Sequence, residues 1–383
     1  MTSEFKKHRF IYAVVNLIGM VVGAGMFGIP YAMAKAGMIV GIFYLLFLGW
    51  AILIIHFCYG EIILRTNQPH RLVGYAAKYL GQRAKKIVTF SILLEYYGAL
   101  LAYVILGSHF LSIIFSRWLS IPEVIWAIIF AAFASFIILF GLKAVSRNEF
   151  FLKTLLFAIL IFLLIKGASL MNFGNLATFD LKSLFLPYGI ILFSLGGSAA
   201  IPEMRKILQG DEKRLKKAII WGTIVPVVLY LFFTLVIVGV SGGDTSPDAI
   251  SGLVSHFGEW VVLLGAVVGL LAVFTPFLML GLALKEMFCD DYHCRKRTGF
   301  ILACFVPLLA YLAGLKNFIL VIGFLGAVAG GLHGIMILWV HAKAKKMGDR
   351  APEYRVRAPK LLAWFLATIF ILGIIYEVFY LIK

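Results

Sequence analysis

Long apolar runs recur along this chain, and they limit what it can fold into more than any other feature. A helix needs about 20 mainly apolar residues to cross the ~30 Å hydrocarbon core of a bilayer, and runs of this kind follow one another from near residue 10 to residue 381. Hydrophobic residues make up 62% of the 383 residues and charged residues only 14%, whereas a charged share near a quarter is usual in soluble domains. The sequence therefore predicts an all-α integral membrane protein with one transmembrane domain, residues 1–383.

The interruptions between these runs predict about eleven membrane-crossing helices. We expect them at residues 10–35, 38–64, 87–115, 122–142, 149–170, 183–208, 217–240, 256–286, 298–313, 317–342 and 361–381. The first run continues to about Lys35, which is longer than the apolar core of a signal peptide. It is therefore expected to be an uncleaved helix.

Basic residues alternate between the two sets of expected loops. One set holds 28 of the 35 Lys and Arg residues, the other holds six, and the remaining one, Lys153, falls inside a helix. Basic loops are retained on the cytoplasmic side, so we expect a multi-pass protein of the plasma (inner) membrane with a cytoplasmic N-terminus and an external C-terminus. The net charge of +17 then belongs to loops that face anionic membrane lipids and does not indicate nucleic-acid binding.

Two glycine-rich segments that end in proline interrupt the first and sixth expected helices. They read GAGMFGIP at Gly23–Pro30 and LGGSAAIP at Leu195–Pro202. If residues 10–170 and 183–342 are two repeats of five helices, with 361–381 as an additional helix, the second repeat enters the membrane from the opposite face. Interrupted segments at corresponding positions of inverted repeats are typical of a transporter's midplane binding site.

A helix broken within the bilayer leaves amide and carbonyl groups that lipid cannot satisfy. Such a break persists where protein, water or a ligand binds those groups, and glycine permits both the unwound backbone and the close approach of a ligand. Free amides around Met26–Gly28 suit an anion, and carbonyls freed around Phe193–Gly196 suit a cation. A zwitterionic amino acid matches both. The alternative is that these glycines serve close helix packing.

These segments resemble the amino acid/auxin permease and aromatic amino acid permease families of the amino acid/polyamine/organocation superfamily. The stretch VVGAGMFGIPYAMAKAGMIVGI resembles their first-helix signature, and YYGALLAYVILG and SLGGSAAIPEM resemble their third- and sixth-helix patterns. The resemblance implies a LeuT-type fold of 5+5 inverted repeats with broken helices 1 and 6, plus an eleventh transmembrane helix. It also implies symport or exchange of amino acids, without a cofactor.

Carried over by position, the resemblance implies which residues bind substrate. Main-chain groups of one set would bind the carboxylate: Gly23, Ala24, Gly25 and Met26. A second set would bind the ammonium group: Ser194, Leu195 and Gly196. Three further positions are expected to bind substrate: Gly28, Gly197 and Ser198. The sequence does not identify the amino acid, although neutral or aromatic substrates are expected.

Ionisable side chains within the membrane need a partner or a function, because burying one there is costly. Glu61 is expected to pair with Arg65 at i+4. Glu95 lies deep in the third helix and is a candidate to accept a proton during transport. Glu203 follows Pro202, where it either caps the half-helix or gates it. Three histidines are each expected to be hydrogen-bonded packing residues, with a proton relay as the alternative: His56, His109 and His333.

The coupling ion is either a proton or sodium. The resemblance implies that sodium-coupled members use hydroxyls of helix eight, where Thr275 is the mid-helix hydroxyl, and that several sodium-independent members place a helix-five lysine at the sodium position. Lys153 resembles that lysine, although Leu156 is nearer the expected register. A single hydroxyl is a poor site for a hard cation that prefers several oxygens. We therefore favour proton-coupled symport or exchange, with sodium symport as the alternative.

Other classes of function have little support in the sequence. Ser198, the serine among the helix-six glycines, lies in GGSAA and not in a G-x-S-x-G elbow, and no H-E-x-x-H pair is present, so we expect no enzyme activity. The segment CDDYHC at Cys289–Cys294 offers too few ligands for a structural zinc site, so we expect no metal. A membrane amino acid sensor that binds ligand without transport remains an alternative with the same fold.

Overall fold

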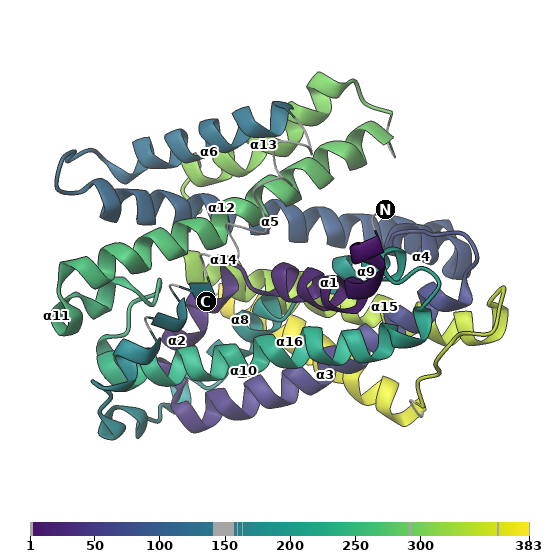
Figure 1. Ribbon diagram of the computed structural model, residues 1–383, viewed down its shortest axis with the longest axis horizontal. Helices are drawn as coiled ribbons and strands as arrows, with labels where there is room; N and C mark the ends of the chain where they lie inside the picture. The colour runs from purple at the N-terminus through teal and green to yellow at the C-terminus, as the bar shows by residue number, and fades with distance from the viewer. Residues whose placement is uncertain are drawn as a thin grey trace.

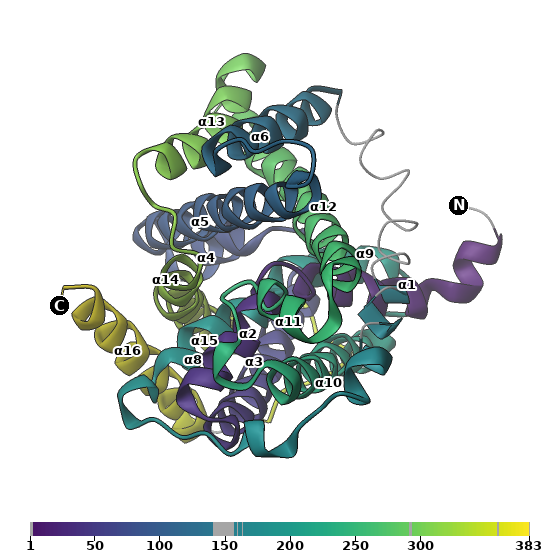
Figure 2. The ribbon, with the colours of Figure 1, turned by 90° about the vertical axis from the view of Figure 1, so that its left-hand side faces the viewer.

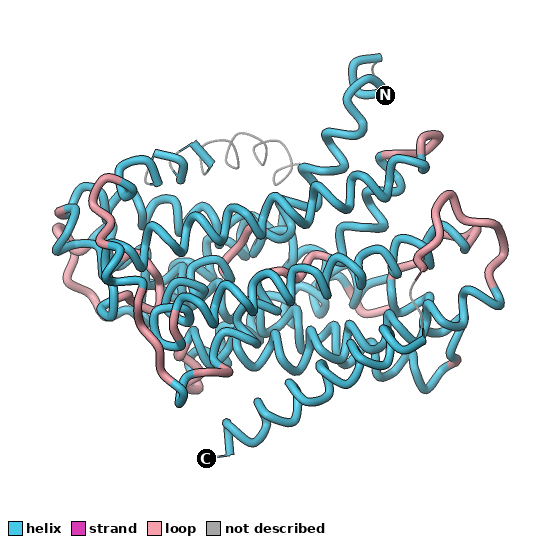
Figure 3. The backbone as a smooth tube through the Cα atoms, turned by 90° about the horizontal axis from the view of Figure 1, so that it is seen from below, coloured by secondary structure: helices cyan, strands magenta, loops and turns pink. Residues whose placement is uncertain are grey.

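The computed structural model describes residues 3–140, 157–158, 160–162, 164–290, 293–357 and 360–382. All regular elements in these ranges are helices (Figure 3). Most helices run close to the longest axis of the molecule, so the connecting loops gather at its two ends (Figure 1). The N-terminal region, α4 and loop 348–357 lie at one end, here named the basic end, and α11 lies at the opposite end (Figure 1).

The first part of the chain contains the first broken helix. Its helices are α1 (Ser3–Val21), α2 (Gly25–Ala36), α3 (Met38–Arg65), α4 (Leu72–Leu80), α5 (Gln82–Phe115) and α6 (Glu123–Phe140). Short 3-10 turns at η1 (Phe173–Leu176) and η2 (Leu181–Ser183) follow residues 164–170. The expected crossing at 149–170 begins outside the described residues.

The second part of the chain contains the second broken helix. Its longer elements are α8 (Leu186–Ser194), α9 (Ile201–Ile207), α10 (Leu215–Ser241), α12 (Glu259–Asp290), α13 (Lys296–Leu312), α14 (Phe318–Phe324), the π-helical segment η7 (Leu325–Gly330), α15 (Gly331–Met347) and α16 (Lys360–Ile382). Short turns connect them: η3 (Ser198–Ala200), η4 (Glu212–Arg214), η5 (Gly242–Asp244), η6 (Ser251–Leu253) and α11 (Val254–Phe257).

Six helices in the described ranges are long and apolar enough to cross a membrane, and the bent pair α1 and α2 makes a seventh span. The six are Met38–Arg65, Gln82–Phe115, Glu212–Asp244, Glu259–Cys289, Phe318–Met347 and Lys360–Ile382. The apolar helices α6 and α13 are shorter, and α8 and α9 are two halves of one interrupted segment. The chain is thus a multi-pass membrane protein, while the full number of crossings stays a prediction.

The helices form two groups, which separate clearly when the molecule is viewed from one end (Figure 2). In the broken-helix group α1 and α2 pack against α10, α2 packs against α8, and α3 packs against α10. In the four-helix group α5, α6, α12 and α13 pack against one another. The helix made of α14, η7 and α15 contacts both groups, since it packs against α8, α3 and α5. Residues at these contacts are therefore placed to sense any movement between the groups.

One helix lies where the sequence analysis expects only a basic loop. Helix α4 buries Leu72, Tyr75, Ala76 and Tyr79, which recur at i, i+3, i+4 and i+7 and form one apolar face. That face packs on α5 and α15. The segment is too short to cross a membrane, which is why a search for long apolar runs misses it.

Candidate functional site

The first helix is broken at the predicted segment. Helix α1 ends at Val21, α2 begins at Gly25, and their axes differ by 56°. The amides of Met26 and Phe27 donate to the carbonyls of Gly23 and Ala24 at 3.2 and 3.1 Å. These two amides are therefore not free, contrary to expectation, because the first turn of α2 closes tightly. The amides of residues 23–25 are left as the candidate anion donors.

The sixth helix is also broken where its glycines and proline lie. Helix α8 ends at Ser194, and the Gly196 amide donates to the Phe193 carbonyl at 3.0 Å. A 3-10 turn at Ser198–Ala200 precedes α9, which has Pro202 in its first turn. Proline suits this position because the first turn of a helix does not use its amide. Both sequence-predicted interruptions are therefore present.

The two breaks lie against each other. A Cβ added at Gly25 would lie 2.5 Å from Ser194 Oγ and 2.7 Å from Ser194 Cα, and one at Gly197 would lie 2.5 Å from Val21 Cγ2. At Gly25 the obstruction includes a backbone atom, so packing requires glycine there, whereas at Gly197 a side-chain methyl group would have to move. At Gly28 the obstruction is a side chain, Ile322 Cδ1 at 2.5 Å. The packing alternative thus explains part of the glycine pattern.

Gly23 has more room than these glycines. A Cβ there would meet the Tyr103 hydroxyl at 3.7 Å and Pro276 Cγ at 3.9 Å, which are ordinary contact distances. Tyr103 lies in α5 and Pro276 in α12, so the first break faces the four-helix group here. Thr275, the predicted sodium ligand, is buried beside Pro276.

Tyr230 of α10 joins the two breaks. Its buried hydroxyl lies 2.8 Å from the Val21 carbonyl and 3.1 Å from the Ser194 carbonyl, both at ends of interrupted helices. A carbonyl left without a partner in the protein interior costs about 1–3 kcal/mol, so this hydroxyl stabilises the unwound geometry. The sequence analysis misses Tyr230, which is one of several polar residues, with Thr223 and Thr234, in the apolar run of α10.

Glu95 and Ser198, both predicted functional residues, contact the same histidine. His333 Nδ1 lies 3.1 Å from Glu95 Oε2, and His333 Nε2 lies 3.0 Å from Ser198 Oγ. His333 belongs to α15, Glu95 to α5 and Ser198 to the second break. His56 has a different partner, the Thr223 hydroxyl at 3.0 Å.

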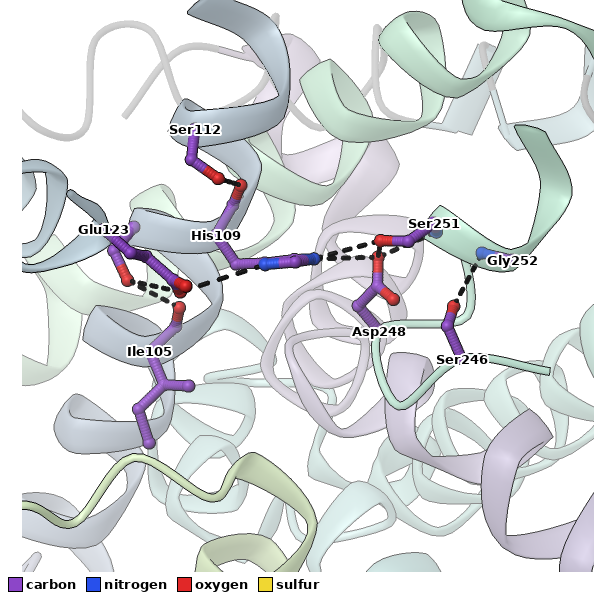
Figure 4. Close-up of polar contacts among 9 residues, drawn as sticks. Ile105, His109, Ser112, Glu123, Ser246, Asp248, Ser251 and Gly252 are labelled. Atoms are coloured by element: carbon purple, nitrogen blue, oxygen red, sulfur yellow. Dashed lines mark hydrogen bonds and ion pairs between the residues drawn. The ribbon is translucent and has the colours of Figure 1, made fainter. Parts of the chain in front are cut away.

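A cluster of polar side chains connects α5 to loop 245–258 at the opposite end (Figure 4). His109 Nε2 lies 3.0 Å from Ser251 Oγ and 3.5 Å from Asp248 Oδ2, and its Nδ1 lies 3.8 Å from Glu123 Oε1. Burial raises the pKa of Asp248, but hydrogen bonding and charge from His109, with hydrogen bonds from Ser246 and Ser251, bring this pKa down to about 2. The Asp248 carboxylate is therefore ionised at neutral pH and holds the loop to α5.

A second network fixes the basic end. The buried carboxylate of Glu61 accepts hydrogen bonds from Arg65 at 2.8 Å and from the Val356 amide at 2.6 Å, and pairs with His341 Nε2 at 2.9 Å. The predicted Glu61–Arg65 pair is thus present. Arg205 of α9 donates to carbonyls at the end of α3.

The two remaining ionisable candidates give less information. Glu203 lies in the first turn of α9 and pairs with Lys206 at 2.7 Å, with both side chains more than half exposed. Either role predicted for Glu203 stays a prediction. Lys153 lies outside the described residues.

The model of the tryptophan/tyrosine permease family matches residues 6–378. The chain is 27% identical to "Tyrosine-specific transport system 2" of Haemophilus influenzae, covering 80% of each chain. It is 26% identical to "Tryptophan-specific transport protein" of Shigella flexneri over 98% of this chain and 95% of the relative. It is 23% identical to "Glutamine transporter 2" of Aliivibrio fischeri over 82% of this chain and 83% of that protein.

The fold is similar to that of MhsT, solved in complex with L-phenylalanine. The TM-score is 0.67 and the sequences are 16% identical, with 97% of this chain and 98% of the other covered. This similarity confirms the LeuT-type fold that the two broken helices and the sequence resemblance imply. With a family match over nearly the whole length, the chain belongs to the tryptophan/tyrosine permease family of membrane transport proteins and is not an enzyme.

Proposed function

We propose that this protein carries neutral or aromatic amino acids across the plasma (inner) membrane by proton-coupled symport or exchange. The observation that carries the proposal is the contact of the two helix breaks at Gly25 and Ser194. It brings the amide-rich start of one half-helix next to the carbonyl-rich end of another, and a zwitterion needs both. Relatives named for tyrosine, tryptophan and glutamine support a neutral amino acid as substrate.

In this proposal the substrate carboxylate binds the amides of residues 23–25 with the Tyr103 hydroxyl nearby. Its ammonium group binds carbonyls of Ser194–Gly196. The other predicted positions surround the substrate: Met26, Gly28, Gly197 and Ser198. The basic end faces the cytoplasm, since it holds the loops rich in Lys and Arg. The opposite end, with the His109 cluster, faces outward.

A ligand screen followed by a flux measurement tests this function. We expect one or a few neutral amino acids to raise the unfolding temperature of the purified protein, because a ligand that binds only the folded state stabilises it by RT ln(1 + [L]/Kd). The same amino acids should undergo counterflow exchange in proteoliposomes. Binding without counterflow would support the sensor, and no binding by any amino acid would contradict the proposed site.

Ion dependence is predicted to follow Lys153 more than Thr275. Lys153→Ala should remove accumulation driven by a pH gradient, because a lysine within the membrane is able to gain and lose a proton during the cycle. Thr275→Ala should have the smaller effect. Uptake against an imposed pH gradient at fixed sodium measures both. Strong sodium dependence that Thr275→Ala loses and Lys153→Ala keeps would favour the sodium symporter. The supporting observation for that alternative is that Thr275 is buried and precedes Pro276, which lies near Gly23.

A further inference from the structure

A hydrogen-bonded chain of three side chains crosses from the four-helix group to the second break. It runs from the Glu95 carboxylate through both ring nitrogens of His333 to the Ser198 hydroxyl, with separations of 3.1 and 3.0 Å. Each residue comes from a different helix. If α5 and the second break move relative to each other, at least one of these two hydrogen bonds must be lost or formed.

The Glu95–His333 pair is only partly exposed, with side-chain exposures of 32% and 13%. An ionisable pair within membrane-spanning helices is costly unless its members neutralise each other or serve transport. Titratable groups on the helices packed around α15 have partners or positions of their own. They include His56, bonded to Thr223, Glu61, bonded to Arg65 and His341, Lys78, paired with Asp349, and Glu377, next to Gly323. Two tyrosines of α5, Tyr96 and Tyr103, interact electrostatically with Glu95. His56 also interacts electrostatically with His333, but its hydrogen bond is to Thr223 and does not connect α5 to the second break.

The chemistry of the chain makes the Ser198 hydroxyl sensitive to one proton. When His333 donates from Nδ1 to the Glu95 carboxylate, Nε2 is bare and accepts from Ser198. When His333 takes a second proton, Nε2 becomes a donor and Ser198 Oγ becomes its acceptor. A serine hydroxyl has a single hydrogen, so that hydrogen then turns towards another acceptor at the break.

We infer that Glu95 and His333 together bind a proton that drives transport. Reorientation of the Ser198 hydroxyl then changes how the second break binds the substrate when the proton is bound. The inference rests on the proposed function and names its coupling site. The proton comes from water on one side of the membrane and returns to water on the other, so no further reactant is needed. Substrate and proton then bias the same element, the break at Ser198, as coupling between two ligands requires. The pair is proposed in addition to Lys153, which lies outside the described residues.

Two variants and a matched control test the pair in proteoliposomes. Glu95→Gln and His333→Gln keep hydrogen-bonding capacity, but each removes one of the two titratable groups that together bind the proton. Both should retain counterflow exchange, which needs no ion gradient, while accumulation driven by a pH gradient falls about tenfold or more, within the usual range of coupling between ligands. Substrate-induced proton uptake, followed with a trapped pH-sensitive dye, should disappear. His56→Gln, at a second buried histidine with a hydroxyl partner, should keep both properties.

Wild-type accumulation in both pair variants, or an equal loss in His56→Gln, would overturn the inference. Ser198→Ala supplies an independent test through binding alone. Thermal shifts by a bound amino acid, compared at about pH 5.5 and about pH 7.5 on either side of the usual histidine pKa, should depend on pH in the wild type and not in Ser198→Ala. Full pH dependence in Ser198→Ala would show that the chain is not the path.

The wild-type protein separates failure of the inference from failure of the proposed function. Absence of counterflow with every amino acid would remove the transport function itself. Counterflow with accumulation driven by sodium and insensitive to pH would overturn the proton site and leave amino acid transport intact.

Discussion

Gly25→Val is expected to abolish amino acid binding and transport while leaving membrane expression largely intact. Its Cβ would lie 2.7 Å from Ser194 Cα, and a backbone atom cannot rotate away as the tip of a side chain can. The added side chain therefore forces α2 away from α8 and separates the two breaks. Ligand-induced thermal shift and uptake into proteoliposomes measure the loss.

Gly330→Ala is the matched control for this variant. Gly330 lies in the π-helical segment η7, and a Cβ there would meet Leu192 Cγ at 3.5 Å, an ordinary contact. Gly330→Ala should bind and transport as the wild type does. Wild-type affinity in Gly25→Val would show that the substrate does not bind where the two breaks meet.

Tyr230→Phe should lower both thermal stability and substrate affinity. Removing the hydroxyl leaves the Val21 and Ser194 carbonyls without this donor, at a cost of about 1–3 kcal/mol. The unwound segments are then less well held before the substrate arrives. Since 1.4 kcal/mol corresponds to a tenfold change in an equilibrium constant, affinity should fall about tenfold to a hundredfold. Unfolding temperature and a binding isotherm measure the two effects.

Thr234→Val is the control for stability in the same helix, one turn further on. Thr234 is fully buried, and its hydroxyl has no hydrogen-bond partner among the described residues. Its replacement by an isosteric apolar side chain should leave the unfolding temperature unchanged or slightly higher. If Tyr230→Phe behaves like Thr234→Val, the hydroxyl does not hold the breaks together.

The breaks themselves are predictable because their cause is local. Glycine and proline within a long apolar run disturb a helix wherever the chain lies, and both interruptions form where GAGMFGIP and LGGSAAIP predict them. Whether packing requires glycine at a given position, however, depends on residues that are distant in the sequence. Gly25 is required by Ser194 on another helix, while a Cβ at Gly23 would make only ordinary contacts with Tyr103 and Pro276.

The residues that connect the breaks to the rest of the protein could not be identified from local sequence. Tyr230 and His333 act through partners far away in the chain, and a polar residue in an apolar helix does not reveal its partner. Glu95 is different, because a carboxylate deep in a membrane helix needs an explanation wherever it occurs. Its depth made Glu95 a candidate to accept a proton, which stays a prediction, but did not point to His333.

Loop 348–357 is bonded to both α3 and α4 and so offers a reference point for measuring movement of the second break. Its Val356 amide bonds to Glu61 of α3, its Asp349 pairs with Lys78 of α4, and its Tyr354 hydroxyl donates to the Phe57 carbonyl. A fluorophore or spin label placed on this loop thus reports the position of α3 and α4 together. A second label can be placed at the exposed Ala199, in the 3-10 turn of the second break. Movement of that break would then change the measured distance between the two labels.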